Sequence, residues 1–223
     1  MKLVNEQFTK LVKHLPTVSE LEYIIEILPM ISVDGPWIVG GCLHRTYRNL
    51  SLKDADVDVF FKNKEQLDKF LLEFNRVSLN TDRYKIISYT VSEWHHTFTI
   101  QYMENELKIQ CVCFKYFESI EALFTSFDIN VCRIAYDGTK LIMEENTLND
   151  INENQLKFNE GSIYYPSVTL KRLVKYVKMG YNIDDVSLKM LTHAFYKSKK
   201  KTIDVLDQDF ITKKPINTYE GLK

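Results

Sequence analysis

The sequence predicts an α+β protein in which a β-sheet is flanked by helices and followed by further helices at the C-terminal end. The chain has 223 residues, of which 45% are hydrophobic and 26% charged. This composition is typical of a globular protein and excludes disordered, collagenous and disulfide-scaffold classes. Short apolar runs typical of strands lie between residues 37 and 143, whereas apolar residues at helical spacing dominate before and after them.

Apolar residues at helical spacing predict two amphipathic helices in the first thirty residues. Ser19, followed three residues later by Glu22, fits a capping box for the second helix. The strands predicted after Pro36 are residues 37–39, 57–61, 84–90, 97–102, 107–114, 131–136 and 140–143, with helices at 64–75 and 118–124 between them. After Glu144 no strand is expected: residues 146–160 read as polar and irregular, and helices follow at 166–180 and 184–197.

The net charge of the chain limits the kinds of partner it can bind, and its cysteines and apolar runs indicate its cellular compartment. With 29 basic and 30 acidic residues the net charge is −1, so phosphate binding would need a local basic patch. No apolar run approaches the roughly 20 residues of a membrane span, and the N-terminus is charged where a signal peptide would be apolar. We therefore expect a cytoplasmic protein without a membrane partner, whose four cysteines are reduced thiols: Cys42, Cys111, Cys113 and Cys132.

The stretch from residue 37 to residue 61 carries the strongest chemical signal. A short apolar strand ends in Gly40–Gly41, and a second strand carries Asp54, Asp56 and Asp58 near its start. Alternate residues of a strand face the same way, so these carboxylates would repel one another unless cations, most plausibly Mg²⁺, neutralise them. The glycines would let backbone amides approach an anion, and His44, Arg45 and Arg48 would add donors and positive charge. The alternative is an ordinary glycine turn beside an acidic strand end.

This stretch resembles the signature of the DNA polymerase β-type nucleotidyltransferase superfamily, in which a hydrophobic-Gly-Gly segment precedes an Asp-hydrophobic-Asp-hydrophobic strand. It resembles in particular the head of class II CCA-adding enzymes and bacterial poly(A) polymerases. The resemblance covers about residues 36–183 and implies a mixed sheet flanked by helices, with a short C-terminal helical neck. Its later segments are residues 109–115 (IQCVCFK), 128–137 (DINVCRIAYD), 148–151 (LNDI) and 169–183 (TLKRLVKYVKMGYNI).

The sequence departs from the family pattern at three places. Gln110 stands where the family carries a third carboxylate, and Ser126 and Phe127 stand where it has two arginines. Residues 164–167 (YYPS) do not reproduce the acidic, arginine-containing motif that contacts the incoming base. Since a neutral amide cannot act as a base and binds metal more weakly than a carboxylate, Gln110 weakens the enzyme interpretation without excluding it.

The resemblance assigns roles to individual residues. Asp54 with Asp56 fits the usual interval from the glycines, but Asp56 with Asp58 directly precedes the apolar strand end. We prefer Asp56 and Asp58 as the metal ligands and catalytic pair, holding two Mg²⁺ ions or Mn²⁺ in their place, with Asp54 in support. The residues implied in nucleotide binding are Gly40, Gly41, Arg45, Asp128, Lys171, Arg172 and Lys175.

Basic side chains form two further patches. On the helix predicted at 166–180, Leu170, Leu173, Val174 and Val177 share one side, which leaves Lys171, Lys175 and Lys178 on the other. This ridge, like the run of residues 197–201 (KSKKK), either contacts phosphate or is a solvated surface. His95 and His96 lack a third ligand at metal spacing and are expected at a strand start.

The sequence thus predicts a head at residues 1–145 and a helical neck region at 146–223. The expected function is metal-dependent transfer of a nucleotide from a nucleoside triphosphate to a hydroxyl acceptor, with an RNA 3′ end as one candidate. The alternatives are a catalytically degenerate module that binds nucleotide or RNA, and a regulatory, antitoxin-like interaction protein. Richness in Lys, Asn, Ile and Tyr hints at an AT-rich, phage-like genome.

Overall fold

The computed structural model describes residues 24–28, 30–52, 55–79, 81–102, 105–159 and 161–198. The first predicted helix, most of the second, Asp54 and the end of the 197–201 basic run lie outside these residues. The described chain forms a seven-stranded sheet in the order β3-β4-β5-β2-β1-β6-β7. Its strands are β1 (Trp37–Val39), β2 (Asp56–Phe60), β3 (Tyr84–Val91), β4 (His95–Tyr102), β5 (Asn105–Val112), β6 (Ile134–Tyr136) and β7 (Leu141–Met143).

The sheet is mixed, as expected for the α+β class. β2 and β5 run parallel, whereas the other neighbouring strands run antiparallel. The connections through the head contain α3 (Gly41–Tyr47), α4 (Lys64–Leu79) and α5 (Ile120–Phe124), with a 3₁₀ turn η1 at Asn130–Cys132. The turn takes the first part of the strand predicted at 131–136, so that β6 begins only at Ile134.

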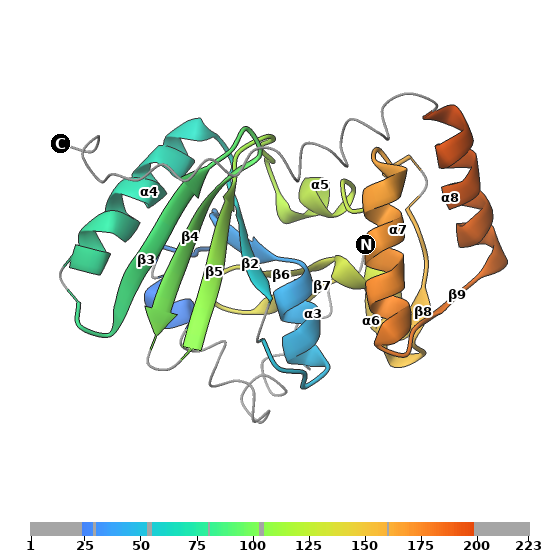
Figure 1. The fold of residues 1–223 in the computed structure, drawn as a ribbon, viewed down its shortest axis with the longest axis horizontal. Coiled ribbons are helices and arrows are strands. Elements are labelled where there is room, and N and C mark those ends of the chain that lie inside the picture. The colour runs from blue at the N-terminus through green and yellow to red at the C-terminus, as the bar shows by residue number, and fades with distance from the viewer. Residues whose placement is uncertain are drawn as a thin grey trace.

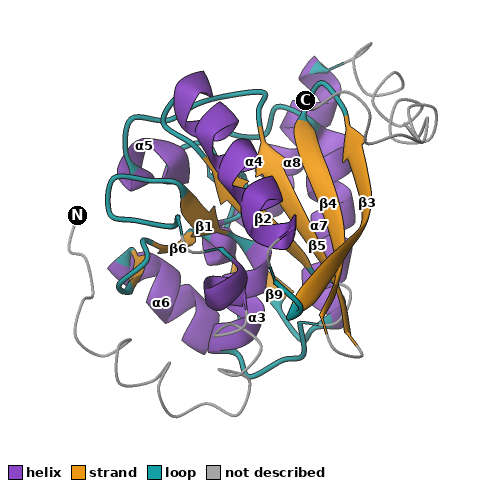
Figure 2. Cartoon of the chain, turned by 90° about the vertical axis from the view of Figure 1, so that its left-hand side faces the viewer, coloured by secondary structure: helices purple, strands orange, loops and turns teal. Residues whose placement is uncertain are grey.

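The two faces of the sheet have different surroundings (Figures 1 and 2). Helix α4 covers one face, where Phe70 and Phe74 stack and Phe74 meets Phe98 edge-on at 4.9 Å between ring centroids. The opposite face of β2, β5 and β4 points toward the C-terminal helices and carries polar side chains from each strand. The larger part of the core therefore lies under α4, and a smaller cluster with Phe60 and α5 lies on the other side, where β2 also presents its carboxylates.

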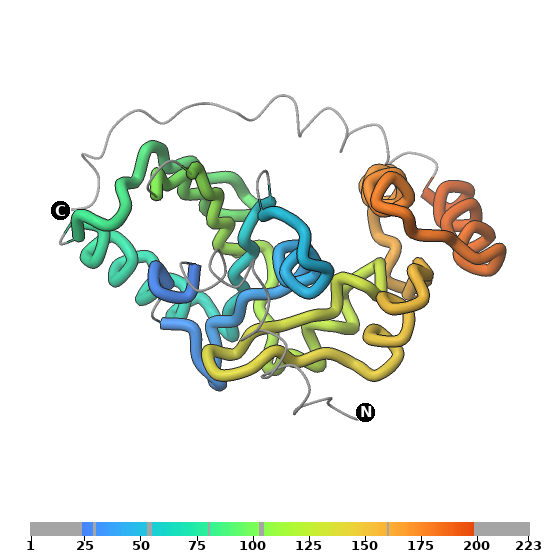
Figure 3. Tube along the Cα trace, turned by 90° about the horizontal axis from the view of Figure 1, so that it is seen from below, coloured from blue at the N-terminus to red at the C-terminus, as the bar shows by residue number. Residues whose placement is uncertain are grey.

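The C-terminal part forms a separate layer beside the head (Figure 3). It contains α6 (Glu145–Asn152), β8 (Gln155–Leu156), α7 (Pro166–Lys178), β9 (Asn182–Ile183) and α8 (Asp185–Lys197). β8 and β9 pair in parallel as a small second sheet. Two expectations were wrong here: residues 146–160 are not irregular throughout, because α6 occupies their first half, and strands do not stop after Glu144.

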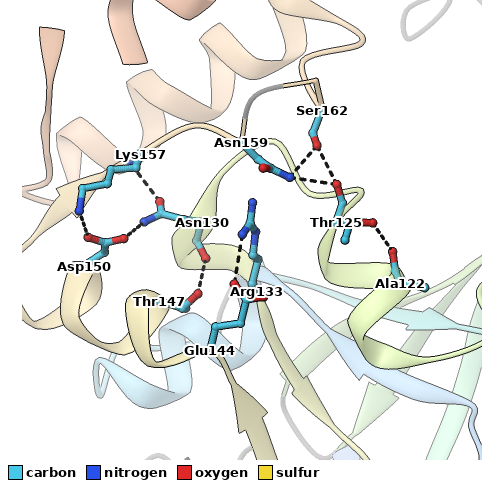
Figure 4. Close-up of polar contacts among 10 residues, drawn as sticks. All are labelled: Ala122, Thr125, Asn130, Arg133, Glu144, Thr147, Asp150, Lys157, Asn159 and Ser162. Atoms are coloured by element: carbon cyan, nitrogen blue, oxygen red, sulfur yellow. Dashed lines mark hydrogen bonds and ion pairs between the residues drawn. The ribbon is translucent and has the colours of Figure 1, made fainter. Parts of the chain in front are cut away.

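A buried polar network explains why a polar sequence folds in this region (Figure 4). Asp150 of α6 is 4% exposed and accepts hydrogen bonds from Asn130 and Lys157. Asn130 in turn accepts from the Lys157 backbone N–H at 2.9 Å, and its carbonyl accepts from Thr147. Because these polar groups bond one another, α6 can bury Asp150 and Thr147 beside Ile151 as it packs on the head.

The buried side of α7 also differs from the prediction. Leu173 is buried, but Leu170, Val174 and Val177 are 41–47% exposed. Polar contacts, and not the apolar periodicity, determine which side of α7 faces the head. Asp128 of the head holds two α7 side chains by hydrogen bonds, and Tyr176 lies 2.9 Å from the Cys132 Sγ. Hydrogen bonds to distant residues thus override the apolar periodicity.

Candidate active site

The glycine bend at the end of β1 lies against the carboxylate of Asp58. Gly40 has φ 103° and ψ −139°, a backbone conformation that favours glycine. A Cβ atom built on Gly40 would stand 3.8 Å from the Asp58 Oδ2 and 3.5 Å from the Phe127 ring. At Gly41, where α3 begins, only the Tyr176 hydroxyl would lie within 4 Å, at 3.8 Å. The structure therefore brings the paired glycines and Asp58 together.

Asp56 and Asp58 share the face of the sheet that α4 does not cover. They alternate along β2 with the buried Val57 and Val59, which point toward the core. On the parallel strand β5, Gln110 lies directly beside Asp58. The resemblance placed a third family carboxylate at this position, and the structure puts the amide of Gln110 beside the acidic pair.

The electrostatics of Asp58 are those of a crowded carboxylate. Burial first, and then the negative charge of Asp56, raise the pKa of Asp58 to about 7, while Arg172 and Lys175 act in the opposite direction. Removing a carboxylate from water next to another carboxylate disfavours its charged form. A bound cation at this point would stabilise both groups.

The donor set is suited to a hard divalent cation. Asp56, Asp58 and Gln110 offer only oxygen atoms to an ion, which is the chemistry that Mg²⁺ and Mn²⁺ prefer. Within the described ranges no group of three or more His, Cys, Asp or Glu side chains could hold a metal ion. The described residues therefore fit one ion held by two carboxylates, with Gln110 as a neutral third oxygen.

The cations expected to bind nucleotide are placed at different positions. Arg172 and Lys175 of α7 are the two whose charges act on Asp58. Lys171 is exposed on the same helix. Arg45 donates from Nη1 to the Ser51 carbonyl at 2.7 Å, so its guanidinium holds the segment that leads to β2.

Asp128 holds the neck helix. Its Oδ2 accepts a hydrogen bond from the Thr169 hydroxyl at 2.5 Å, and its Oδ1 accepts one from Arg172 Nη1 at 2.8 Å. The Asp128 side chain is only 7% exposed, whereas that of Arg172 is 52% exposed. In this arrangement Asp128 positions Arg172 near Asp58, and the ribose contact that the resemblance implies stays a prediction.

The expectation that His44 supplies positive charge was wrong. His44 is fully buried, and burial, with the nearby cations Arg48 and Lys175, lowers its pKa to about 3. Its Nε2 lies 2.7 Å from the Tyr181 hydroxyl, and its ring meets the Tyr176 ring edge-on. His44 is thus a neutral packing residue that joins α3 to the neck. Sequence reasoning missed this because the contacting tyrosines lie more than 130 residues away.

Arg48 is also engaged in holding the fold. Its Nη1 donates to the Asn154 side chain at 2.6 Å and to the Ile151 carbonyl at 3.1 Å. These contacts tie the end of α3 to the end of α6. The histidine pair, by contrast, lies as predicted, since β4 begins at His95.

A protein-family comparison matches most of the head. The model of a family described as "Gabija anti-defense 2 family protein" matches residues 4–154. A curated relative, "Gabija anti-defense 2" from Bacillus phage SPbetaL7, is 29% identical over 188 residues. The match covers 83% of this chain and 40% of the relative, so the chain spans less than half of the relative's length.

Solved structures share the fold at low sequence identity. The Thermotoga maritima CCA-adding enzyme complexed with tRNA matches with a TM-score of 0.59 and 15% identity, over 88% of this chain and 47% of the enzyme. A CCA-adding enzyme complexed with ATP gives a TM-score of 0.61 at 15% identity, over 88% and 46% of the two chains. The Bacillus stearothermophilus enzyme in complex with CTP gives 0.53 at 16% identity, over 78% and 42%. These matches confirm the nucleotidyltransferase-like fold. Among the described residues no helix is long and apolar enough to cross a membrane.

Proposed function

Since the chain belongs to the Gabija anti-defense 2 family, we propose that it acts against that defence as a metal-dependent nucleotidyltransferase. The reaction would transfer a nucleotide from a nucleoside triphosphate to a hydroxyl acceptor, in the cytoplasm of the cell that holds the defence. The observation that carries the proposal is the contact of Asp58, paired with Asp56 on one sheet face, with the glycine bend at Gly40.

Asp56 and Asp58 would hold the divalent cation, with Gln110 beside them. A bound Mg²⁺ or Mn²⁺ would supply charge stabilisation to the phosphate oxygens. Asp56, Asp58 and Gln110 would hold one such ion, and a second ion is part of the proposal without a described ligand set. Asp54, outside the described residues, would support the pair.

The chain's own residues would position the triphosphate. Glycines at positions 40 and 41 leave room for phosphate oxygens next to the backbone, and the charges of Arg172 and Lys175 act on Asp58. Transfer forms a bond between the acceptor oxygen and the α-phosphorus, breaks the bond to pyrophosphate, and releases the hydroxyl proton. Arg172 and Lys175 would stabilise the negative charge on the departing pyrophosphate.

The nature of the acceptor is a further part of the proposal. The solved structures of similar fold include an enzyme complexed with tRNA and others with ATP or CTP. An RNA 3′ end is one hydroxyl acceptor that this chain would use. Arg45, Lys171 and Asp128 keep their proposed roles in nucleotide binding as secondary contacts.

One observation favours a second candidate function. Gln110 occupies the position of a third carboxylate, and a neutral amide holds a metal less strongly. A member of this family that binds nucleotide or RNA without transferring it, or that acts only by contact with a partner protein, would tolerate such a residue.

The test compares the wild type with Asp56→Ala and with the control Asp68→Ala, an exposed carboxylate on α4. Each protein is incubated with Mg²⁺, one labelled nucleoside triphosphate at a time, and total RNA or total protein. Label transfer by the wild type and the control, and not by Asp56→Ala, would support the enzyme. Stabilisation by nucleotide without transfer would favour the binding module, and neither response would favour the interaction protein.

A further inference from the structure

An aromatic cluster of Trp94, Phe114 and Tyr165 joins the sheet to the start of α7. Trp94 precedes β4, Phe114 follows β5, and Tyr165 is the N-cap residue of α7. The Trp94 ring centroid lies 5.4 Å from that of Phe114, in a tilted arrangement, and 5.9 Å from that of Tyr165, edge-on. Trp94 therefore contacts both other rings, although the three residues come from separate parts of the chain.

The cluster is more exposed than a core would be. Phe114 is 54% exposed and Tyr165 is 39% exposed, and neither belongs to the two hydrophobic clusters of the core. The preceding Tyr164 is 64% exposed. Contiguous exposed apolar side chains mark interaction sites, whereas single exposed ones are ordinary on protein surfaces.

The position of the cluster relative to Asp58 follows from the strand register. Asp58 lies beside Gln110, and the Cys113 N–H donates to the Trp94 carbonyl at 2.9 Å. Trp94 therefore lies three residues further along the strand direction than Asp58, which is roughly 10 Å, and two strands to the side, which is roughly another 10 Å. The side chains of Asp58 and Trp94 and one nucleoside between them would together span this offset.

The cluster and the glycine bend lie on opposite sides of β2. The glycine bend is on β1, which is one neighbour of β2, whereas Trp94 and Phe114 adjoin β4 and β5 on the other side. Lys175 stands next to Tyr176, whose ring contacts His44 of α3. In an in-line displacement the attacking oxygen and the leaving pyrophosphate are opposite each other, so the acceptor approaches from the side of the cluster.

We propose that Trp94, Phe114 and Tyr165 form a stacking site for the 3′-terminal base of a single-stranded RNA acceptor. The inference rests on the proposed function for the direction of attack. Every base offers a flat π-face, so aromatic stacking binds an RNA end with little sequence preference. A basic groove is not required, because one terminal nucleoside occupies the site.

The test measures binding of an eight-nucleotide single-stranded RNA by fluorescence anisotropy, without nucleoside triphosphate. The same oligomer with an abasic 3′-terminal residue is the second probe. Phe114→Leu and Tyr165→Leu remove a ring but keep apolar volume, Phe114→Tyr keeps the ring, and Tyr196→Leu changes an exposed ring on α8. Thermal unfolding of each variant checks that it is folded.

We expect Phe114→Leu and Tyr165→Leu to bind the intact oligomer at least about fivefold more weakly than the wild type, as loss of one stacked base predicts. Phe114→Tyr and Tyr196→Leu should bind as the wild type does, and the abasic oligomer should bind all the proteins equally weakly. Equal binding of both oligomers by the wild type, or unchanged binding by both leucine variants, overturns the inference.

Transfer assays separate this inference from the proposed function. If no acceptor is labelled while the ring-dependent binding persists, the proposed function fails and the stacking site stands. If the wild type labels a polypeptide and the leucine variants label it equally well, the enzyme stands and the RNA-stacking site is wrong.

Discussion

The buried His44 makes the folded protein sensitive to acid in a calculable way. Its pKa is lowered from 6.5 to about 3, because burial and nearby cations disfavour the imidazolium. The imidazolium carries an N–H on both ring nitrogens, and the buried Nδ1 has no hydrogen-bond partner among the described residues to accept such a bond. The folded state therefore keeps the imidazole neutral over the range in which the unfolded chain takes up a proton.

The size of the effect follows from the two pKa values. A histidine whose pKa is depressed on folding contributes stability that is complete above the unfolded pKa of 6.5 and is lost as the pH falls toward 3. Between pH 8 and pH 5.5 the unfolded state gains about 1.4 kcal/mol from protonation that the folded state does not gain. The raised pKa of Asp58 acts in the opposite direction over part of this range, so the wild type alone does not isolate the histidine.

A matched variant isolates it. His44→Gln keeps a polar side chain that can reach the Tyr181 hydroxyl but does not titrate. Urea unfolding of both proteins at pH 8 and at pH 5.5 gives the free energy of unfolding at each pH. We expect the advantage of the wild type over the variant to shrink by about 1.4 kcal/mol at the lower pH. A difference that does not change with pH would show that His44 is protonated in the folded state and that our reasoning is wrong.

Three further predictions concern the site. Gly40→Ala should destabilise the fold by about 1–3 kcal/mol through backbone strain. Gly41→Ala should leave the melting temperature unchanged or raised and weaken nucleotide binding in calorimetry. Equal effects of the two variants on stability would contradict the positive φ of Gly40. Gln110→Glu should increase the rise in melting temperature caused by Mg²⁺, and an unchanged rise would place Gln110 away from the ion. Asp128→Asn and Arg172→Met should show a coupling of about 1 kcal/mol in a double-mutant cycle of unfolding, since Arg172 is half exposed, and additivity would mean that their ion pair contributes nothing.

Much of the sheet could be predicted because its pattern is local. The run of residues 57–61 is apolar after the acidic strand start, and the structure makes it β2. The strands predicted at 84–90, 97–102 and 107–114 are confirmed to within two residues at each end. Apolar burial against α4 fixes these strands, and the residues that take part are neighbours in sequence or one hairpin apart.

The errors share a different physical cause. α6 is polar, so its composition predicted a loop. The contact of Asp150 with Asn130, which lies twenty residues away, holds it as a helix. The buried side of α7 is set by Asp128, which is more than forty residues from Arg172. Periodicity reports only the apolar contribution, and it fails where hydrogen bonds to distant residues decide which side is buried.

The site was predictable to a similar extent. The glycine pair and the acidic strand could be identified from their residue types, and the resemblance implied that Gln110 would lie beside them. The aromatic cluster was not predicted, because its rings come from the ends of β4 and β5 and from α7, and no spacing links them. The signal for two of the three rings was their place beside a hairpin: Trp94 precedes β4 and Phe114 follows β5. The division at residues 145 and 146 stays a prediction.

One carboxylate determines where the positive charge of the neck stands. Asp128 grips the first turn of α7 through Thr169 and the next turn through Arg172. Two contacts on successive turns fix the rotation of α7 about its own axis. Arg172 and Lys175 therefore keep their positions near β2 in the absence of a ligand. The entropic cost of ordering these side chains thus falls on folding and not on binding, so the positive charge is already in place when a polyanion binds.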